Sequence, residues 1–116
     1  MFRRLVAVAA LLVISIASAS ARADADKKTE RLWKAKCASC HGADGKAQTD
    51  QGVKMGIADY SAPAWQKAHG DAELKQVIAG GVQKEQGGKK QEMGGYKDLG
   101  DEQLNALVAY VRLLGN

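Results

Sequence analysis

The chain has 116 residues, with 17 Lys or Arg, 13 Asp or Glu and a formal net charge of +4. This length allows one small domain, which is only marginally stable on apolar packing alone and needs an additional staple. The sequence contains 13 glycines but only 2 cysteines, so that staple is a single disulfide, a metal or a bound group.

Residues 1–23 have the pattern of a secretory signal peptide. A basic start is followed by an apolar run over residues 5–17 and by small residues over 18–23. The run is shorter than the ~20 residues that span a bilayer. We therefore expect cleavage after Ala21 or Ala23 and export to the periplasm or beyond, with a retained anchor as the alternative.

Cleavage after Ala23 leaves one domain over residues 24–116. It removes three arginines and no acidic residue, so the formal net charge falls from +4 to +1. The basic charge of the full chain therefore does not indicate nucleic-acid binding. We also expect no stable membrane insertion of the cleaved chain.

The pattern after the signal predicts an all-α fold without a strand pair. Apolar spacing and end signals predict a first helix over Asp26–Cys40, beginning at an Asp26 cap, and a second over Asp71–Ala79, with Gly80-Gly81 as its stop. The clearest helix is predicted over Asp101–Leu114, which has five apolar residues at helical spacing: Leu104, Leu107, Val108, Val111 and Leu114.

Two segments between these helices are rich in glycine and polar residues. Residues 41–64 are expected to form a loop with one helical turn near Val53–Met55. Val82–Leu99 is expected to form a second loop, in which the Gln86–Lys90 stretch is too polar to enter the core.

Both cysteines belong to one short motif, Cys37-Ala38-Ser39-Cys40-His41. C-x-x-C-H is the pattern of covalent haem attachment. Cysteines three positions apart at a helix end project to one side, where they can form thioethers with the two vinyl groups of one porphyrin. His41 then lies under the iron as the proximal ligand, and the haem supplies the core that the chain lacks.

Three other sites use the same residue types. A thioredoxin-like dithiol needs a strand before the motif, whereas here a helix is predicted. A zinc site made from the two cysteines, His41 and His69 matches no zinc-finger spacing. A disulfide between Cys37 and Cys40 closes too short a loop to stabilise the fold. We therefore predict one covalently attached haem c.

Met93 is the predicted second axial ligand. It precedes the last helix and lies on no apolar helical face, so core packing does not account for it. A thioether on a loop can reach the far face of the haem. The alternatives are Met55, which we expect to pack against apolar neighbours, His69, or a lysine.

The domain resembles a small class I cytochrome c over nearly its whole length. The resemblance rests on Trp33-x-x-x-Cys37-Ala38-Ser39-Cys40-His41-Gly42, Val77–Gly81, Met93 with Tyr96, and Leu104–Leu113. It implies three to four helices and long loops around one haem, with crossing N- and C-terminal helices. Gly94 stands where the family usually has a proline after its methionine, so we expect a loosely held ligand loop.

A haem with protein ligands on both sides, in a domain without a second catalytic cluster, transfers electrons and does not transform a substrate. We therefore expect a monomer, not an enzyme, that shuttles single electrons between redox partner proteins. The alternative is a haem-based sensor of small ligands or a weak peroxidase, if Met93 is absent from the iron or easily displaced. We further expect four lysines to surround the exposed haem edge and to attract an acidic partner: Lys84, Lys89, Lys90 and Lys97.

Overall fold

The structure, a computed structural model, describes residues 26–116, so the predicted signal peptide lies outside the described residues. Residues 26–36 form the N-terminal helix. The later elements are, in chain order, α2 (Ala38–His41), α3 (Asp50–Met55), α4 (Pro63–Ala68), α5 (Asp71–Gly80), β1 (Val82–Gln86), β2 (Lys89–Met93), the 3-10 turn η1 (Lys97–Leu99) and α6 (Gly100–Leu114). Within residues 26–116, no helix has the length and apolar character needed to cross a membrane.

The first predicted helix is present but is divided at Cys37. The N-terminal helix ends there and α2 follows directly. The Cys37 amide still donates to the Trp33 carbonyl (2.8 Å), so the two pieces continue one helical path. Gly42, at φ +81°, ends α2 in a conformation that glycine adopts without strain. The predicted cap at Asp26 falls on the first described residue.

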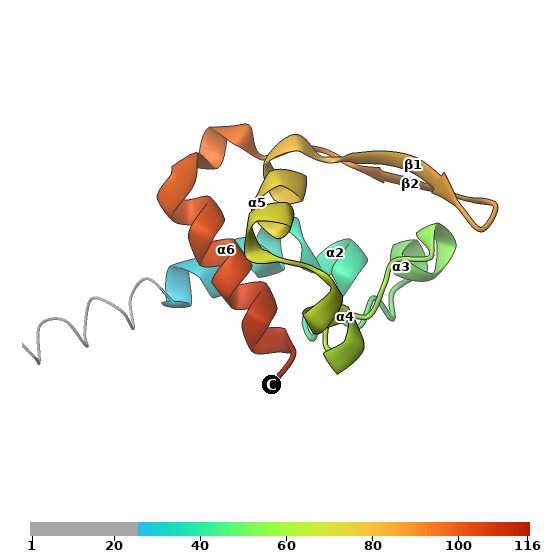
Figure 1. The fold of residues 1–116 in the computed structure, drawn as a ribbon, viewed down its shortest axis with the longest axis horizontal. Coiled ribbons are helices and arrows are strands. Elements are labelled where there is room, and N and C mark those ends of the chain that lie inside the picture. The colour runs from blue at the N-terminus through green and yellow to red at the C-terminus, as the bar shows by residue number, and fades with distance from the viewer. Residues whose placement is uncertain (1–25) are drawn as a thin grey trace, which may run out of the picture.

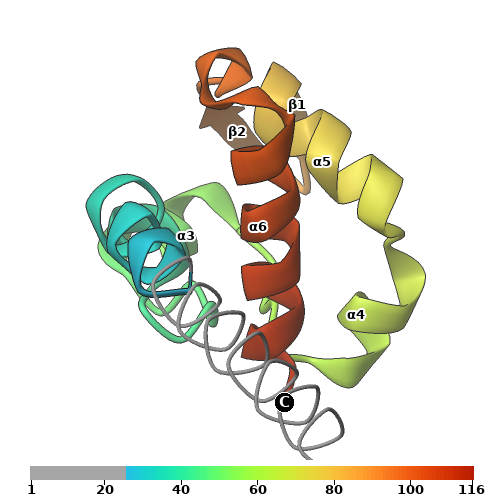
Figure 2. The ribbon, with the colours of Figure 1, turned by 90° about the vertical axis from the view of Figure 1, so that its left-hand side faces the viewer.

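The core lies where the N-terminal helix, α5 and α6 meet (Figures 1 and 2). The Trp33 and Tyr110 rings lie 5.4 Å apart, which confirms the expected contact between the terminal helices. The apolar spacing of the last helix is confirmed as well, because four of its five predicted core residues are buried: Leu104, Leu107, Val108 and Val111.

The prediction of a loop over Val82–Leu99 is wrong for its first part, and the fold is therefore not purely all-α. β1 and β2 form an antiparallel hairpin in which Val82 pairs with Met93 and Gln86 with Lys89. Gly87 and Gly88, at φ +58° and +73°, make the two-residue turn. Paired glycines between two strands are a hairpin signal, but these strands are polar and exposed, so they lack the apolar alternation that marks most strands.

The segment before α5 contains more helix than predicted. The turn expected near Val53–Met55 is confirmed as part of α3, whose N-terminus is capped by the Thr49 side chain. α4 was not predicted; it begins at Pro63, a residue favoured in the first helical turn. The described part of the chain therefore has more and shorter helices than the three to four expected.

Candidate functional site

Cys37, Cys40 and His41 lie on a single helical turn. The amides of Cys40 and His41 both donate to the Cys37 carbonyl, at 3.2 and 2.9 Å. Both cysteines are free and half-buried. The motif thus presents two unpaired thiols and one imidazole from a few consecutive residues.

Three hydrogen bonds hold the end of this turn. The buried Trp33 indole donates to the Gly42 carbonyl (3.0 Å). The Thr49 hydroxyl donates to the Cys40 carbonyl (2.6 Å), and the Ala47 amide donates to the His41 carbonyl (2.8 Å). Trp33, important in the family resemblance for helix packing, therefore also positions the C-x-x-C-H motif.

The His41 imidazole is held in a form that can bind a metal. Its ring stacks on Tyr60 with a centroid distance of 4.9 Å and lies 5.7 Å from the Trp33 ring. Burial lowers the pKa of His41, so the ring is neutral at neutral pH and keeps a lone pair. Its Nδ1 atom is buried without a hydrogen-bond partner among the described residues.

The alternative sites do not fit this geometry. Burial, with a smaller contribution from Cys40, raises the pKa of Cys37 to about 11, the opposite of an activated redox thiol. His69 hydrogen-bonds Glu73 (2.9 Å), and two stacked rings, Tyr60 and Trp65, separate it from His41. Residues 26–116 contain no group of three or more His, Cys, Asp or Glu side chains placed to hold a metal ion.

The packing leaves one side of the domain without a core of its own. The buried apolar cluster comes from the N-terminal helix, α5 and α6. In contrast, α2 and α4 contain no buried residue, α3 contains only Gly52, and the hairpin residues are exposed or half-buried. A large flat apolar group held at α2 fits this one-sided arrangement, since it covers side chains that the protein alone leaves half-exposed.

Met93 is the last residue of β2 and is half-buried. Side chains alternate along a strand, so Met93 shares a face with Gln91, whose amide donates to the Met55 carbonyl at the end of α3 (2.9 Å). Three residues after Met93, the Tyr96 hydroxyl donates to the Lys36 carbonyl (3.3 Å). The pKa of Tyr96 is raised by burial and, secondarily, by the thiols of Cys37 and Cys40, so its side chain lies near the motif.

The structure does not support the expected loose ligand loop, because the segment after Met93 is packed against α5 at Gly95 and Tyr96. Gly95 lies directly against the backbone of α5, and the Tyr96 amide donates to the Ile78 carbonyl (3.0 Å). Glycines in a loop usually give the backbone freedom. The structure uses Gly95 for a close backbone approach that a side chain would prevent.

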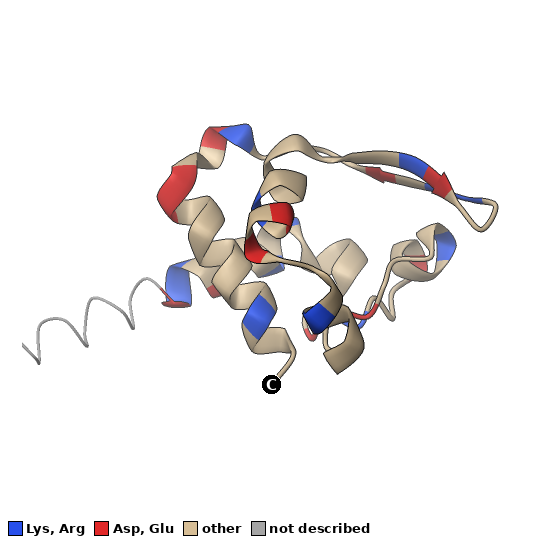
Figure 3. Ribbon diagram, in the orientation of Figure 1, with Lys and Arg blue, Asp and Glu red and all other residues tan. Residues whose placement is uncertain are grey.

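The four predicted docking lysines do not form one patch. Lys89 donates to the Val53 carbonyl (3.0 Å), and Lys90 pairs with Glu92 (3.1 Å). Lys84 lies near Glu73 of α5. The pKa of Glu73 is lowered mainly by its hydrogen bond with His69 and to a smaller extent by the charge of Lys84. Lys97 belongs to η1, at the opposite end of the molecule from the hairpin turn, and the hairpin itself carries both charge signs (Figure 3).

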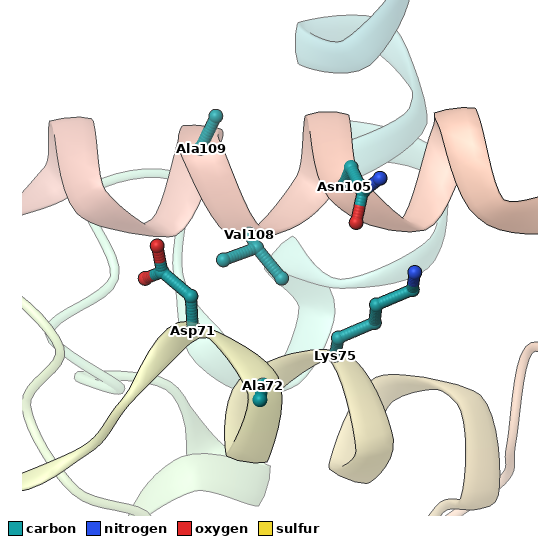
Figure 4. A pocket seen from close by; sticks show the side chains of 6 residues that line it. All are labelled: Asp71, Ala72, Lys75, Asn105, Val108 and Ala109. Carbon is teal, nitrogen blue, oxygen red and sulfur yellow. The ribbon is translucent and has the colours of Figure 1, made fainter.

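Two shallow depressions lie outside the motif. One, of about 290 Å³, lies between α5 and α6, and its lining includes Asp71, Lys75 and Val108 (Figure 4). Its charged groups are paired, Asp71 with Arg112 and Lys75 with Asp101. The other, of about 350 Å³, lies beside Met93 and Gly81.

Comparison with known proteins identifies the family. The cytochrome c family model matches residues 27–115, so the chain belongs to the cytochrome c family, whose members carry covalently attached haem c. Among solved structures, the KustC0563 c-type cytochrome is similar, with 27% identity and a TM-score of 0.60 over 75% of this chain and 96% of that one. No curated protein matches the chain at a significant level.

Proposed function

We propose that this chain is an exported carrier that shuttles single electrons between redox partner proteins through one haem c. Cys37 and Cys40 would hold the haem through thioether bonds, and His41 and Met93 would supply the two protein ligands of its iron. When bound, the haem supplies a couple between ferric and ferrous iron. A thioether ligand favours the ferrous form relative to a second imidazole, so Met93 raises the reduction potential.

The proposal rests chiefly on the three side chains of the C-x-x-C-H motif and on their protonation and bonding. A neutral, half-buried imidazole and two free thiols lie on one turn, which matches the donor set for two thioethers and one iron ligand. Tyr60 stacks on the imidazole and restricts its rotation. The bond between Tyr96 and the Lys36 carbonyl brings the segment after Met93 close to the same motif, which supports Met93 over Met55.

Replacing each methionine tests the ligand and with it the carrier function. We expect Met93→Ala to lose the weak sulfur-to-iron absorption band of the ferric protein, to become high-spin and to bind cyanide. Met55→Ala is the matched control and should keep the band, with a packing loss of up to about 3 kcal/mol. A high-spin ferric spectrum in the unsubstituted protein would instead favour the sensor or peroxidase alternative.

The lysine surface is part of the proposal and has its own test. Although these lysines do not form one patch, we propose that an acidic partner contacts them over a broad surface that extends from the hairpin, with Lys84, Lys89 and Lys90, to η1, with Lys97. At low salt, the protein should exchange electrons rapidly with an electrode coated with a carboxylate-terminated monolayer, and the rate should fall as salt screens the charges. Lys84→Glu and Lys97→Glu should each slow the exchange more than Lys67→Glu, which makes the same charge change on α4. Equal effects of all three variants would contradict the proposed surface.

A further inference from the structure

The segment that carries Met93 is attached to the rest of the fold on both sides of that residue. On the C-terminal side, a Cβ atom on Gly95 would lie 2.5 Å from the Ala79 carbonyl oxygen and 3.0 Å from the Gly80 carbonyl carbon. The Tyr96 amide adds a hydrogen bond to the Ile78 carbonyl (3.0 Å). The backbone after Met93 therefore lies directly on the C-terminal end of α5.

Gly81 completes this contact from the opposite side. It adopts φ +79°, and a Cβ atom there would lie 2.5 Å from the Met93 carbonyl oxygen and 2.9 Å from the Gly95 nitrogen. The two glycines thus form an interlock, which we define as the backbone contacts of Gly81 with the Met93–Gly95 segment and of Gly95 with Ala79 and Gly80. Only residues without a Cβ atom allow this approach.

On the N-terminal side, β2 is attached to the end of α3. The Gln91 side-chain amide donates to the carbonyls of Met55 (2.9 Å) and Gly56 (3.1 Å), and Lys89 donates to the Val53 carbonyl (3.0 Å). The last carbonyls of a helix lack partners within the helix and carry partial negative charge, so they are favourable acceptors. β2 and the residues that follow it, up to Tyr96, therefore bridge α3 and α5.

Met93 lies between these two attachments, two residues from Gln91 and two from Gly95. Its backbone is also paired with Val82 in the hairpin. So short a segment has little slack, and Met93 cannot move far unless one attachment opens.

We infer that Gly95 and Gln91 are positioning residues that hold Met93 on the haem iron and make the site resistant to competing ligands. This inference rests on the proposed ligation by Met93. It implies that ligand exchange at the iron requires a local opening of the β2 bridge, so the Gly81–Gly95 interlock and the Gln91 bonds determine how fast external ligands enter.

The test compares adjacent glycines in the ferric holoprotein. Gly95→Ala inserts a methyl group into the interlock. Gly94→Ala is the matched control, because a Cβ atom there meets nothing within 4 Å. The probe is imidazole, and the readouts are its rate of binding, the intensity of the sulfur-to-iron band and amide hydrogen exchange at Tyr96. We expect Gly95→Ala to bind imidazole roughly tenfold faster, which corresponds to about 1.4 kcal/mol, and to expose the Tyr96 amide.

A second pair of variants covers the case in which Gly95→Ala does not fold. Gln91→Ala removes the bonds to α3, whereas Gln83→Ala removes a glutamine from the other strand, on the opposite face of the hairpin. We expect faster imidazole binding only for Gln91→Ala, in protein whose denaturant midpoint shows that it is still folded.

The outcomes separate the inference from the proposed function. A wild-type protein without the sulfur band refutes ligation by Met93 and the inference with it. A wild-type protein with the band, in which the Gly95→Ala and Gln91→Ala variants bind imidazole at the rates of their controls, refutes the inference alone and leaves the carrier function standing.

Discussion

At the scale of single residues, Tyr60 links the motif to α4. Its ring lies between His41 and Trp65, at centroid distances of 4.9 and 4.1 Å. Burial, and to a lesser degree the Cys37 thiol, raises the pKa of Tyr60 to about 12. The phenol is therefore neutral at any physiological pH, and its contribution near the imidazole is packing and orientation.

The raised pKa of Tyr60 predicts a loss of stability in strong base. The unfolded chain loses this proton near pH 10, whereas the folded protein keeps it up to about pH 12. Stability is thus complete below pH 10 and falls by about 1.4 kcal/mol per pH unit between these values. Denaturant unfolding of wild type and Tyr60→Phe from pH 8 to 12 isolates this slope, because Tyr96 and Tyr110 remain in both. Identical slopes would show that Tyr60 titrates normally.

At the scale of elements, Arg112 connects α6 to α4 and α5. Its guanidinium donates to the Gln66 carbonyl (2.8 Å), the His69 carbonyl (2.5 Å) and the Asp71 carboxylate (2.8 Å). Gln66 extends the connection, because its amide donates to the Tyr60 and Val111 carbonyls. One side chain on α6 thus determines where α4, and with it the ring stack on His41, is placed.

Removal of this connection should destabilise the fold. We expect Arg112→Ala to cost about 2 kcal/mol, since it leaves partly buried carbonyls without their charged donor. Asp71→Asn should cost little, because the Asp71 side chain is 74% exposed and water screens the ion pair. Denaturant unfolding of both variants, with Leu113→Ala on the exposed side of α6 as control, measures the difference. A larger cost for Asp71→Asn than for Arg112→Ala would contradict this order.

At the scale of the whole molecule, buried apolar side chains are distributed unevenly between the three-helix core and the part formed by α2, α3, α4 and the hairpin. The described residues contain one buried apolar cluster, to which only the N-terminal helix, α5 and α6 contribute buried side chains. The hairpin, α3 and α4 rely on hydrogen bonds, rings and close glycine contacts. We expect such contacts to offset the conformational entropy of ordering only when an attached haem completes the packing.

Folding should therefore depend on haem attachment. We expect Cys37→Ala/Cys40→Ala, produced without haem, to unfold without a cooperative thermal transition, while the holoprotein unfolds sharply. Circular dichroism during heating distinguishes the two, with the holoprotein as control. A sharp transition in the haem-free variant would show that the three-helix core is sufficient.

The sequence alone identified the C-x-x-C-H motif and predicted the principal helices. Cys37, Cys40 and His41 belong to one turn, so their relative positions follow from the local helical conformation. The apolar spacing of α6 predicted its buried residues because residues at that spacing share one face of a helix. The family resemblance also indicated the contact between the terminal helices at Trp33.

Only the tertiary structure decided how the Met93 segment is held and where the lysines lie. Gln91 and Met55 are 36 positions apart, and Arg112 and Gln66 are 46 apart. Polar partners at such separations leave no periodic pattern in the sequence. The glycines near Met93 are equally ambiguous, because an absent side chain permits either freedom or close contact. At Gly95, the neighbouring backbone of α5 shows that the absent side chain permits close contact.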